Sequence, residues 1–407
     1  MSSGWTPRSL AEGDAVSWPE KGRNGNPMTI EDIAARRLAA QGIEGCRLSA
    51  PEEAVARMGA IQAQDYEMAK WAIGLRTSRA TRGAVQAAID RGRLLRAHLL
   101  RPTWHFVTAA DYGWIHALTA PRIRAALRSR HLRLELTDAL ISKSEILLEN
   151  KLGGGKSATR EALVAALEEA GIPTRENRGW HVLVRAELDG VLCSGPDLSG
   201  RPTYALRADR VSAARVLPRD EALAALAGRY FAGHGPATLA DFVWWSGLPA
   251  ADAKRALEAA RRGLESIRID SAVYWFAGGL PSARRRSPGA YLLPAYDEYI
   301  LGYRDRGVVL SPRAAKGVIS TNGVFWPVVL AGGQAAGLWR RRVTPDTALV
   351  EVDLFSEPER DLKRAIASAA GRYGRFLGAA VETAYAPKAP GGRGRRRPGA
   401  SRRLSSR

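Results

Sequence analysis

Apolar residues recur at helical spacing near the start of the chain. The apolar positions of 30–38 fall on one face of a helix that ends near Gly42, and 49–52 resembles a capping box that opens a second helix. A third helix is predicted to begin at Thr81. The extended stretch 94–107 follows, and the proline at its middle predicts two strand pieces.

A similar order of elements follows in the next part of the chain. Either Ser157 or Thr159 caps a helix, and 180–188 has the pattern of a second helix. Two short extended runs, 191–194 and 203–206, flank a loop rich in glycine and proline and predict a hairpin. Two helices followed by a hairpin with a long polar loop is the order of a winged helix.

The order appears a third time after residue 219. A capping-box pattern at 238–241 leads into the aromatic run 242–245, and 249–262 is predicted to be the next helix. The runs 266–269 and 272–276 are predicted to form a hairpin. Three such units in tandem would make a largely helical chain with small β-wings.

The pattern changes to longer strands beyond residue 291. Three strands and a final helix are predicted there, at 324–330, 335–339, 348–355 and 357–377. The predicted fold is therefore mainly α with small β-wings, built from three tandem winged-helix units plus a C-terminal α/β region. The expected divisions are a disordered N-terminal extension at 1–27, unit 1 at 28–150, unit 2 at 151–218, unit 3 at 219–285, the α/β region at 286–386 and a basic disordered tail at 387–407.

Charge adds a partner to this picture. The 407 residues carry a net charge of +20, of which eight positive charges lie in 388–407, so +12 remains on the other 387 residues. Such an excess favours a polyanion partner, most simply double-stranded DNA, although a basic surface can also serve only solubility. The two cysteines, Cys46 and Cys193, lie far apart and fit a reducing compartment. No membrane span or signal core is visible, so we expect a cytoplasmic, nucleoid-associated monomer that binds no membrane.

The most informative feature for chemistry is the pair Gln62 and Gln64, which flanks Ala63 inside a hydrophobic run. Each amide has donors and an acceptor, so an inward-facing pair must find partners or incur a cost of roughly 1–3 kcal/mol each. A soluble protein has little structural reason to place two amides there. They are instead suited to holding a water molecule and a polar substrate, and we take them as the candidate catalytic residues.

Other candidates have ordinary structural explanations beside the functional ones. Asp65, next to Gln64, is a possible base, but its side chain would point away from at least one glutamine. His105 lies among aromatic residues on a short strand, where a hydrogen-bonded core histidine is the commoner outcome. The acids Asp297 and Glu298 could supply a carboxylate, but we expect them to pair with local arginines.

Candidate DNA contacts lie on the second predicted helix of unit 2, at Trp180, His181 and Arg185, and at Arg304 and Arg306, which are also the expected partners of Asp297 and Glu298. The glycine-rich run at 153–157 lacks the first glycine of a phosphate-binding loop, so we expect no nucleotide site. The histidines and cysteines show no metal spacing, and we predict neither a metal nor a cofactor.

Taken in order, several short motifs resemble the winged-helix DNA glycosylases of the AlkZ type over 28–382. The segments that carry the resemblance are 62–66, 70–76, 99–106, 235–241, 244–247, 293–299 and 302–306. The family's catalytic Gln–apolar–Gln motif maps onto Gln62, Ala63 and Gln64, whereas the related YcaQ branch carries aspartate at the second glutamine. Gln64 therefore favours the two-glutamine branch.

The resemblance implies three winged-helix units around a basic DNA channel and hydrolysis of N-glycosidic bonds to alkylated purines. Substrates in the family include N7-alkylguanine and, for some members, interstrand crosslinks. The family also uses a β-hairpin at the DNA, which the sequence does not place. No lysine stands out as a Schiff-base nucleophile, so a monofunctional enzyme is expected.

The expected chemistry suits two amides. An N7-alkylated guanine is cationic and leaves readily, so an amide with no usable basic pKa need only position the attacking water. The main alternative is a DNA-binding protein without catalysis, such as a winged-helix transcription regulator. A scaffold that uses winged helices only for protein contacts would leave the basic body unexplained.

Overall fold

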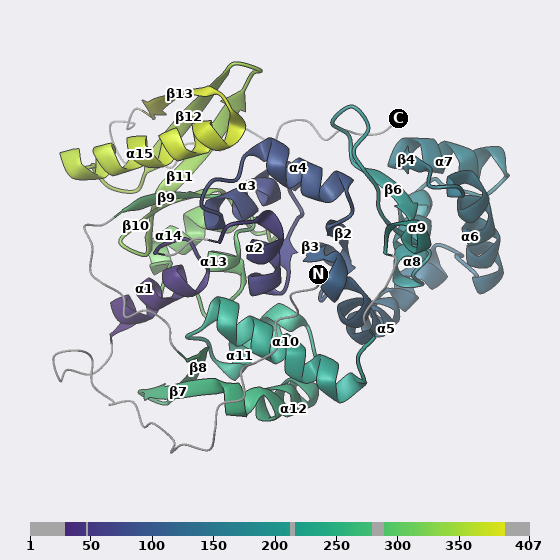
Figure 1. The fold of residues 1–407 in the computed structure, drawn as a ribbon, viewed down its shortest axis with the longest axis horizontal. Coiled ribbons are helices and arrows are strands. Elements are labelled where there is room, and N and C mark those ends of the chain that lie inside the picture. The colour runs from purple at the N-terminus through teal and green to yellow at the C-terminus, as the bar shows by residue number, and fades with distance from the viewer. Residues whose placement is uncertain (1–28, 46–47, 212–215, 279–288, 387–407) are drawn as a thin grey trace.

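The computed structural model describes residues 29–45, 48–211, 216–278 and 289–386. The expected N-terminal extension and the basic tail lie outside these residues. Helices predominate and most strands are short, as the sequence predicted (Figure 1). The elements form four groups, which are described in chain order.

The first group combines four helices with an antiparallel sheet of strand order β1-β3-β2. Its elements are α1 (Ile30–Ala40), α2 (Pro51–Met58), β1 (Ile61–Gln62), α3 (Tyr66–Arg76), α4 (Arg82–Asp90), β2 (Leu94–Leu99) and β3 (Thr103–Thr108). Thr81 caps α4, as predicted. Helix α2 lacks the capping box predicted at 49–52, because Ser49 binds the Glu53 carboxylate and Ala50 occupies the N-cap position.

The long helix α5 (Ala109–Arg133), which the pattern did not predict, leads into the second group. That group contains α6 (Asp138–Leu152), β4 (Ser157–Thr159), α7 (Arg160–Glu169), α8 (Arg178–Leu188), β5 (Leu192–Ser194), β6 (Thr203–Leu206) and α9 (Arg207–Arg210). Its sheet has the order β4-β6-β5. Leu148 of α6 shares a core with Leu163 of α7, so α6 packs with the second group although the sequence placed 28–150 in unit 1.

The third group consists of three helices and a hairpin. Its elements are α10 (Arg219–His234), α11 (Leu239–Ser246), α12 (Ala250–Ala260), the single turn η1 (Arg261–Gly263), β7 (Leu264–Ile269) and β8 (Ala272–Ala277). The predicted capping box is confirmed, because Thr238 and Asp241 bond each other's backbone at the start of α11. The predicted hairpin is also confirmed, and Ala237 bridges Trp275 at its edge.

The fourth group is a five-stranded sheet of order β13-β12-β11-β10-β9 with three helices. Its elements are β9 (Ala290–Leu293), α13 (Glu298–Leu301), α14 (Pro312–Val318), β10 (Val328–Ala331), β11 (Gln334–Val343), β12 (Thr347–Leu354), α15 (Arg360–Leu377) and β13 (Ala380–Tyr385). Strand β13 runs parallel to β12, and the other pairs are antiparallel. The mixed α/β character expected at this end is confirmed.

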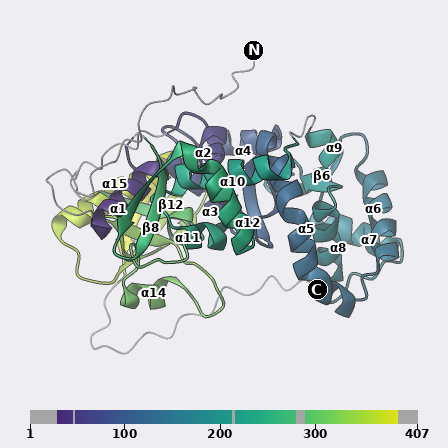
Figure 2. The same cartoon turned by 90° about the horizontal axis from the view of Figure 1, so that it is seen from below.

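The first and fourth groups share one hydrophobic core. Trp71 of α3 packs edge-on against Tyr373 of α15, and its indole nitrogen donates to the Leu292 carbonyl at 2.7 Å. The second group lies at one end of the molecule in both views, and α5 faces the other groups (Figures 1 and 2). Strand β1 ends at Gln62, whose backbone bonds Glu298 of the fourth group, and Glu298 also accepts from Trp245 of the third. The first, third and fourth groups therefore meet at Gln62.

Candidate functional site

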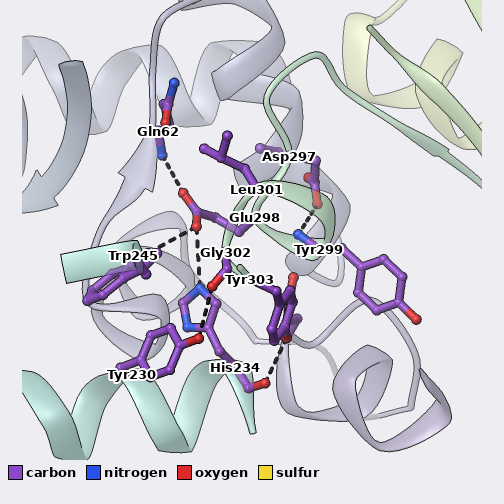
Figure 3. A network of polar contacts seen from close by, with 12 residues as sticks. Gln62, Tyr230, His234, Trp245, Asp297, Glu298, Tyr299, Leu301, Gly302 and Tyr303 are labelled. Atoms are coloured by element: carbon purple, nitrogen blue, oxygen red, sulfur yellow. Dashed lines mark hydrogen bonds and ion pairs between the residues drawn. The ribbon is translucent and has the colours of Figure 1, made fainter. Parts of the chain in front are cut away.

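Gln62 is the last residue of β1 and is 5% exposed. It lies opposite His105 of β3. Its backbone N–H donates to Oε1 of Glu298 at 2.8 Å (Figure 3), and its side-chain Oε1 accepts from Nη2 of Arg101 at 3.0 Å. Because a guanidinium only donates, the Gln62 amide must turn its oxygen toward Arg101. Its Nε2 therefore points away from Arg101.

Glu298 anchors this strand from the start of α13. Its Oε2 accepts from the indole of Trp245 at 3.1 Å and contacts Nε2 of His234 at 3.3 Å (Figure 3). Burial opposes ionisation of Glu298, but the hydrogen bond from His234 and the one from Gln62 N–H hold the pKa of this carboxyl below its ordinary value. The carboxylate is thus a fixed acceptor that sets the position of the Gln62 backbone.

Asp297 has a different partner from the one predicted. Its carboxylate forms a two-pronged ion pair with Arg76, with both N–O distances at 2.9 Å. The expectation that Asp297 and Glu298 pair with Arg304 or Arg306 is therefore wrong. Arg304 and Arg306 lie beyond the end of α13, whereas the two acids point back into the core at the start of that helix, where Arg76 and His234 meet them.

Gln64 does not accompany Gln62 into the core, so the expected inward-facing pair is wrong for this residue. The chain leaves the extended conformation after Gln62, and the peptide of Ala63 is held from two sides. Its N–H donates to the Trp104 carbonyl at 2.7 Å, and its carbonyl accepts from Nε and Nη2 of Arg96 at 3.0 and 2.9 Å. This turn directs Gln64 to the surface.

The exposed Gln64 lines a pocket of about 420 Å³ between the first and second groups. Tyr66, Arg96 and Trp104 line it from the first group, and Trp180 and Asp197 line it from the second. The Arg96 guanidinium lies 4.1 Å from the centroid of the Trp104 ring. Gln62 is therefore fixed in the interior, whereas Gln64 lines an adjacent pocket.

The two supporting candidates occupy structural positions. Asp65 is the N-cap of α3 and accepts from the Met68 amide at 3.0 Å. His105 is fully buried, and its Nδ1 lies 2.9 Å from the Thr103 carbonyl. Burial, with the nearby charge of Arg101, lowers the pKa of His105 to about 4, so the ring is neutral near pH 7. It is a neutral neighbour of Gln62 in the sheet.

The residues predicted on a recognition helix lie on α8, most of which is packed inside the second group. His181 is buried against His131, and Trp180 lies against His98 and His181. Arg185 is paired with Asp189 at 2.5 Å. The helix thus offers Trp180 to the Gln64 pocket, but it does not present a free polar face.

Sequence reasoning missed four residues of the site. They are Arg96, Arg101, Trp244, which contacts Arg101, and Trp245, which donates to Glu298. Arg96 had a usable signal, because it is a lone cation in the apolar run 94–100. Arg101 had none, since an arginine beside a proline in a turn is usually solvated. Its contact with Gln62 depends on the tight β2–β3 turn, whose close approach to α11 only the folded chain reveals.

Neither a metal centre nor a membrane helix is found in the part of the chain that the structure describes. No cluster of three or more histidine, cysteine, aspartate or glutamate side chains there is arranged to hold a metal ion. No helix there is both long and apolar enough to cross a bilayer. The chemistry visible at the site is that of two amides, a buried carboxylate and neighbouring guanidinium groups.

Comparison with known proteins identifies the family. Residues 55–376 match the model of a family described as DNA glycosylase AlkZ-like. A curated relative, the interstrand DNA cross-link repair glycosylase of Streptomyces sahachiroi, is 25% identical over 369 residues, which cover 85% of this chain and 96% of the relative. The solved structure of the Streptomyces sahachiroi DNA glycosylase AlkZ shares the fold, with a TM-score of 0.70 and 23% identity over 88% of this chain and 99% of that one. The chain therefore belongs to the AlkZ-like family of DNA glycosylases.

Proposed function

We propose that this DNA glycosylase hydrolyses the N-glycosidic bond of cationic alkylated purines, with N7-alkylguanine as the simplest substrate. The observation that carries the proposal is the fixed amide of Gln62, whose oxygen is held by Arg101. We propose that its nitrogen binds the attacking water. Gln64, two residues further on, is exposed and lines the adjacent pocket, where we propose that it contacts the sugar. We propose that the enzyme acts on duplex DNA as a monomer in the nucleoid.

The reaction needs no strong acid or base. Attack of the water oxygen on C1′ accompanies cleavage of the C1′–N9 bond, and the bond's electron pair neutralises the positive charge of the leaving base. The proton released from the water passes to solvent. Amides cannot accept that proton, but they can fix the water, and the free carbonyl oxygen of Gln64 can place partial negative charge near an oxocarbenium-like sugar. Undamaged purines, which are poor leaving groups without protonation, are spared.

The environment of Lys70, the lysine nearest to the glutamine motif, also supports base release without strand cleavage. Lys70 is fully buried, and its side-chain nitrogen lies 2.7 Å from the Glu67 carboxylate, so it is not accessible as a Schiff-base nucleophile. We therefore propose a monofunctional glycosylase that leaves the abasic strand intact.

The DNA-binding architecture belongs to the same proposal. In the first two groups a helix, a strand, two helices and two strands follow in order, and in the third group Ala237 stands in place of the first strand. We propose that these are three winged-helix units.

The β11–β12 hairpin has Arg340 and Arg342 exposed on β11, which favours it as the hairpin that contacts DNA. The relative's name adds interstrand crosslinks as a candidate substrate class.

The test uses duplex DNA that contains one N7-methylguanine. We expect the wild type to release the methylated base and to leave an abasic site that breaks only on later alkaline treatment. Gln62→Ala and Gln64→Ala should each lower the single-turnover rate by about 10²-fold while duplex binding is retained. Gln334→Ala, at an exposed glutamine far along the chain, is the matched control. Absence of base release by the wild type from both methylated and crosslinked duplexes would refute the proposed substrate class.

A further inference from the structure

Two arginines converge on one exposed tryptophan beside Gln62. Trp244 of α11 is 39% exposed, which is unusual for so large an apolar side chain. The Arg101 guanidinium, from the β2–β3 turn, lies 5.4 Å from the centroid of its ring. The Arg306 guanidinium, from the loop after α13, lies 5.0 Å from the same centroid. We refer to Arg101, Trp244 and Arg306 as the arginine–tryptophan cluster.

The cluster is a like-charged pair that forms no ion pair among the described residues, although Glu298 attracts Arg101 and both Asp241 and Asp305 attract Arg306 from further away. Within the described residues, neither Arg101 nor Arg306 lies within 4.0 Å of a carboxylate oxygen. Nε of Arg101 and Nη2 of Arg306 are buried and have no hydrogen-bond partner in the part of the chain that the structure describes. Burial lowers the pKa of both groups, and the charge of Arg101 lowers that of Arg306 further. Two cations held together in this way form a site for an anion.

Three separate segments hold the cluster in place. The indole nitrogen of Trp244 donates to the Leu301 carbonyl at 3.0 Å, and Nε of Arg306 donates to the Ile300 carbonyl at 3.2 Å. The turn that carries Arg101 packs against Gly247, where an added Cβ would lie 2.9 Å from the Leu100 carbonyl oxygen. Gly247 has a φ of +67°, so both its conformation and this close approach require glycine. The arrangement is therefore preorganised rather than formed by mobile surface arginines.

We propose that Arg101 and Arg306 bind one phosphodiester of the substrate strand next to the lesion. Planar guanidinium groups match the geometry of phosphate oxygens, and a phosphate between them would neutralise their repulsion. Arg101 also donates to Oε1 of Gln62, so the bound phosphate and the amide are connected through one side chain. The two arginines are positioning residues that place the lesion's sugar against the water-binding amide. This inference rests on the proposed function.

The decisive experiment combines a mutation with removal of a single charge from the DNA. Duplexes that contain one N7-methylguanine carry one methylphosphonate, which is uncharged, at each of the neighbouring phosphate positions in turn. We expect the wild type to lose about tenfold in single-turnover rate at one position. Arg306→Gln should be slower on unmodified DNA and should lose clearly less than the wild type when that same phosphate is neutral, because only Arg101 still contacts it.

Two control variants separate this contact from general effects. Arg364→Gln removes an exposed arginine of α15 and should respond to each methylphosphonate as the wild type does. Arg306→Lys retains the charge and should recover part of the sensitivity at the critical position. If Arg306→Gln is slowed further by every methylphosphonate, by the same factors as the wild type, the phosphate contact is refuted. A purely structural defect would produce that additive pattern.

Binding to undamaged duplex tests the contact without any chemistry. Arg306→Gln should make the slope of log K against log salt shallower by up to about 0.9, the value for complete loss of one phosphate contact, and Arg364→Gln should leave the slope unchanged. An unchanged slope in Arg306→Gln would count against the proposal. Because this readout needs no catalysis, it separates failure of the phosphate site from failure of the proposed glycosylase activity, which the wild type alone decides.

Discussion

At the scale of single residues, the motif is held by groups that do not themselves react. His105 lies opposite Gln62 and is neutral because burial, and then Arg101, lower its pKa to about 4. Its Nε2 has no hydrogen-bond partner among the residues that the structure describes. A histidine kept neutral in the folded state binds fewer protons than the same residue in the unfolded chain, where its pKa is about 6.5. The folded protein must therefore lose stability as the pH falls below that value.

This property gives a prediction on pH. Between pH 7 and pH 5 the unfolded chain gains a proton at His105 that the folded chain does not bind, which lowers the free energy of unfolding by about 2 kcal/mol. The variant His105→Gln should lack this loss, so its stability should depend less steeply on pH than that of the wild type. Denaturant unfolding at pH 7 and pH 5 measures the difference, with Gln334→Ala as the control. Equal pH dependence in wild type and His105→Gln would show that the ring is accessible to protons.

The residue scale also shows what the sequence could predict about the motif. The pattern identified Gln62 and Gln64, but not that they would separate, because side-chain alternation applies only while the strand continues. Strand β1 is two residues long, and Arg96 holds the Ala63 carbonyl at the turn that follows. Since Arg96 comes from another strand, the end of β1 is decided by tertiary contact. Local sequence could not reveal it.

At the scale of elements, the sequence was most informative where an N-cap residue preceded apolar residues at helical spacing. Thr81 and Thr238 begin α4 and α11 as predicted, because a hydroxyl cap is a local interaction. Helix α8 was also predicted correctly as a helix, but its surroundings were not. Its polar residues suggested an exposed face, whereas Glu187 is 1% exposed and binds His98 of β2 at 2.5 Å. A polar side chain signals either solvent or a buried partner, and only the fold distinguishes them.

A pair of variants on α8 tests this interpretation. Glu187→Ala removes the partner of a buried histidine and should lower the free energy of unfolding by about 3 kcal/mol. Arg185→Ala, on the same helix, breaks a less buried pair with Asp189 and should cost about 1 kcal/mol or less. Denaturant unfolding and duplex binding are measured for both. If α8 instead contacts DNA, Arg185→Ala will weaken binding strongly and Glu187→Ala will leave stability nearly unchanged.

At the scale of the whole molecule, the C-terminal sheet is part of the first group's core. Sequence divided 28–150 from 286–386 because the strand pattern changes between them. The structure joins the two through Trp71, whose indole bonds the Leu292 carbonyl, and through the buried pair of Arg76 and Asp297. Contacts of such long sequence separation leave no local periodicity. They also fix α13, and thereby Glu298 and the backbone of Gln62, relative to the sheet.

The shared core predicts which elements lose stability together when one buried residue is substituted. Asp297→Asn leaves the fully buried Arg76 without its counter-ion and should lower the free energy of unfolding by about 3–5 kcal/mol. Hydrogen exchange should then accelerate together in α3 and in strands β9 to β12, because they belong to one core, while α6 to α8 keep their protection. Glu351→Gln, which breaks an exposed pair with Arg342, is the matched control and should change exchange little. Faster exchange confined to α13 would mean that the C-terminal sheet is stabilised independently. Faster exchange in α6 to α8 as well would mean that all the groups unfold as one unit.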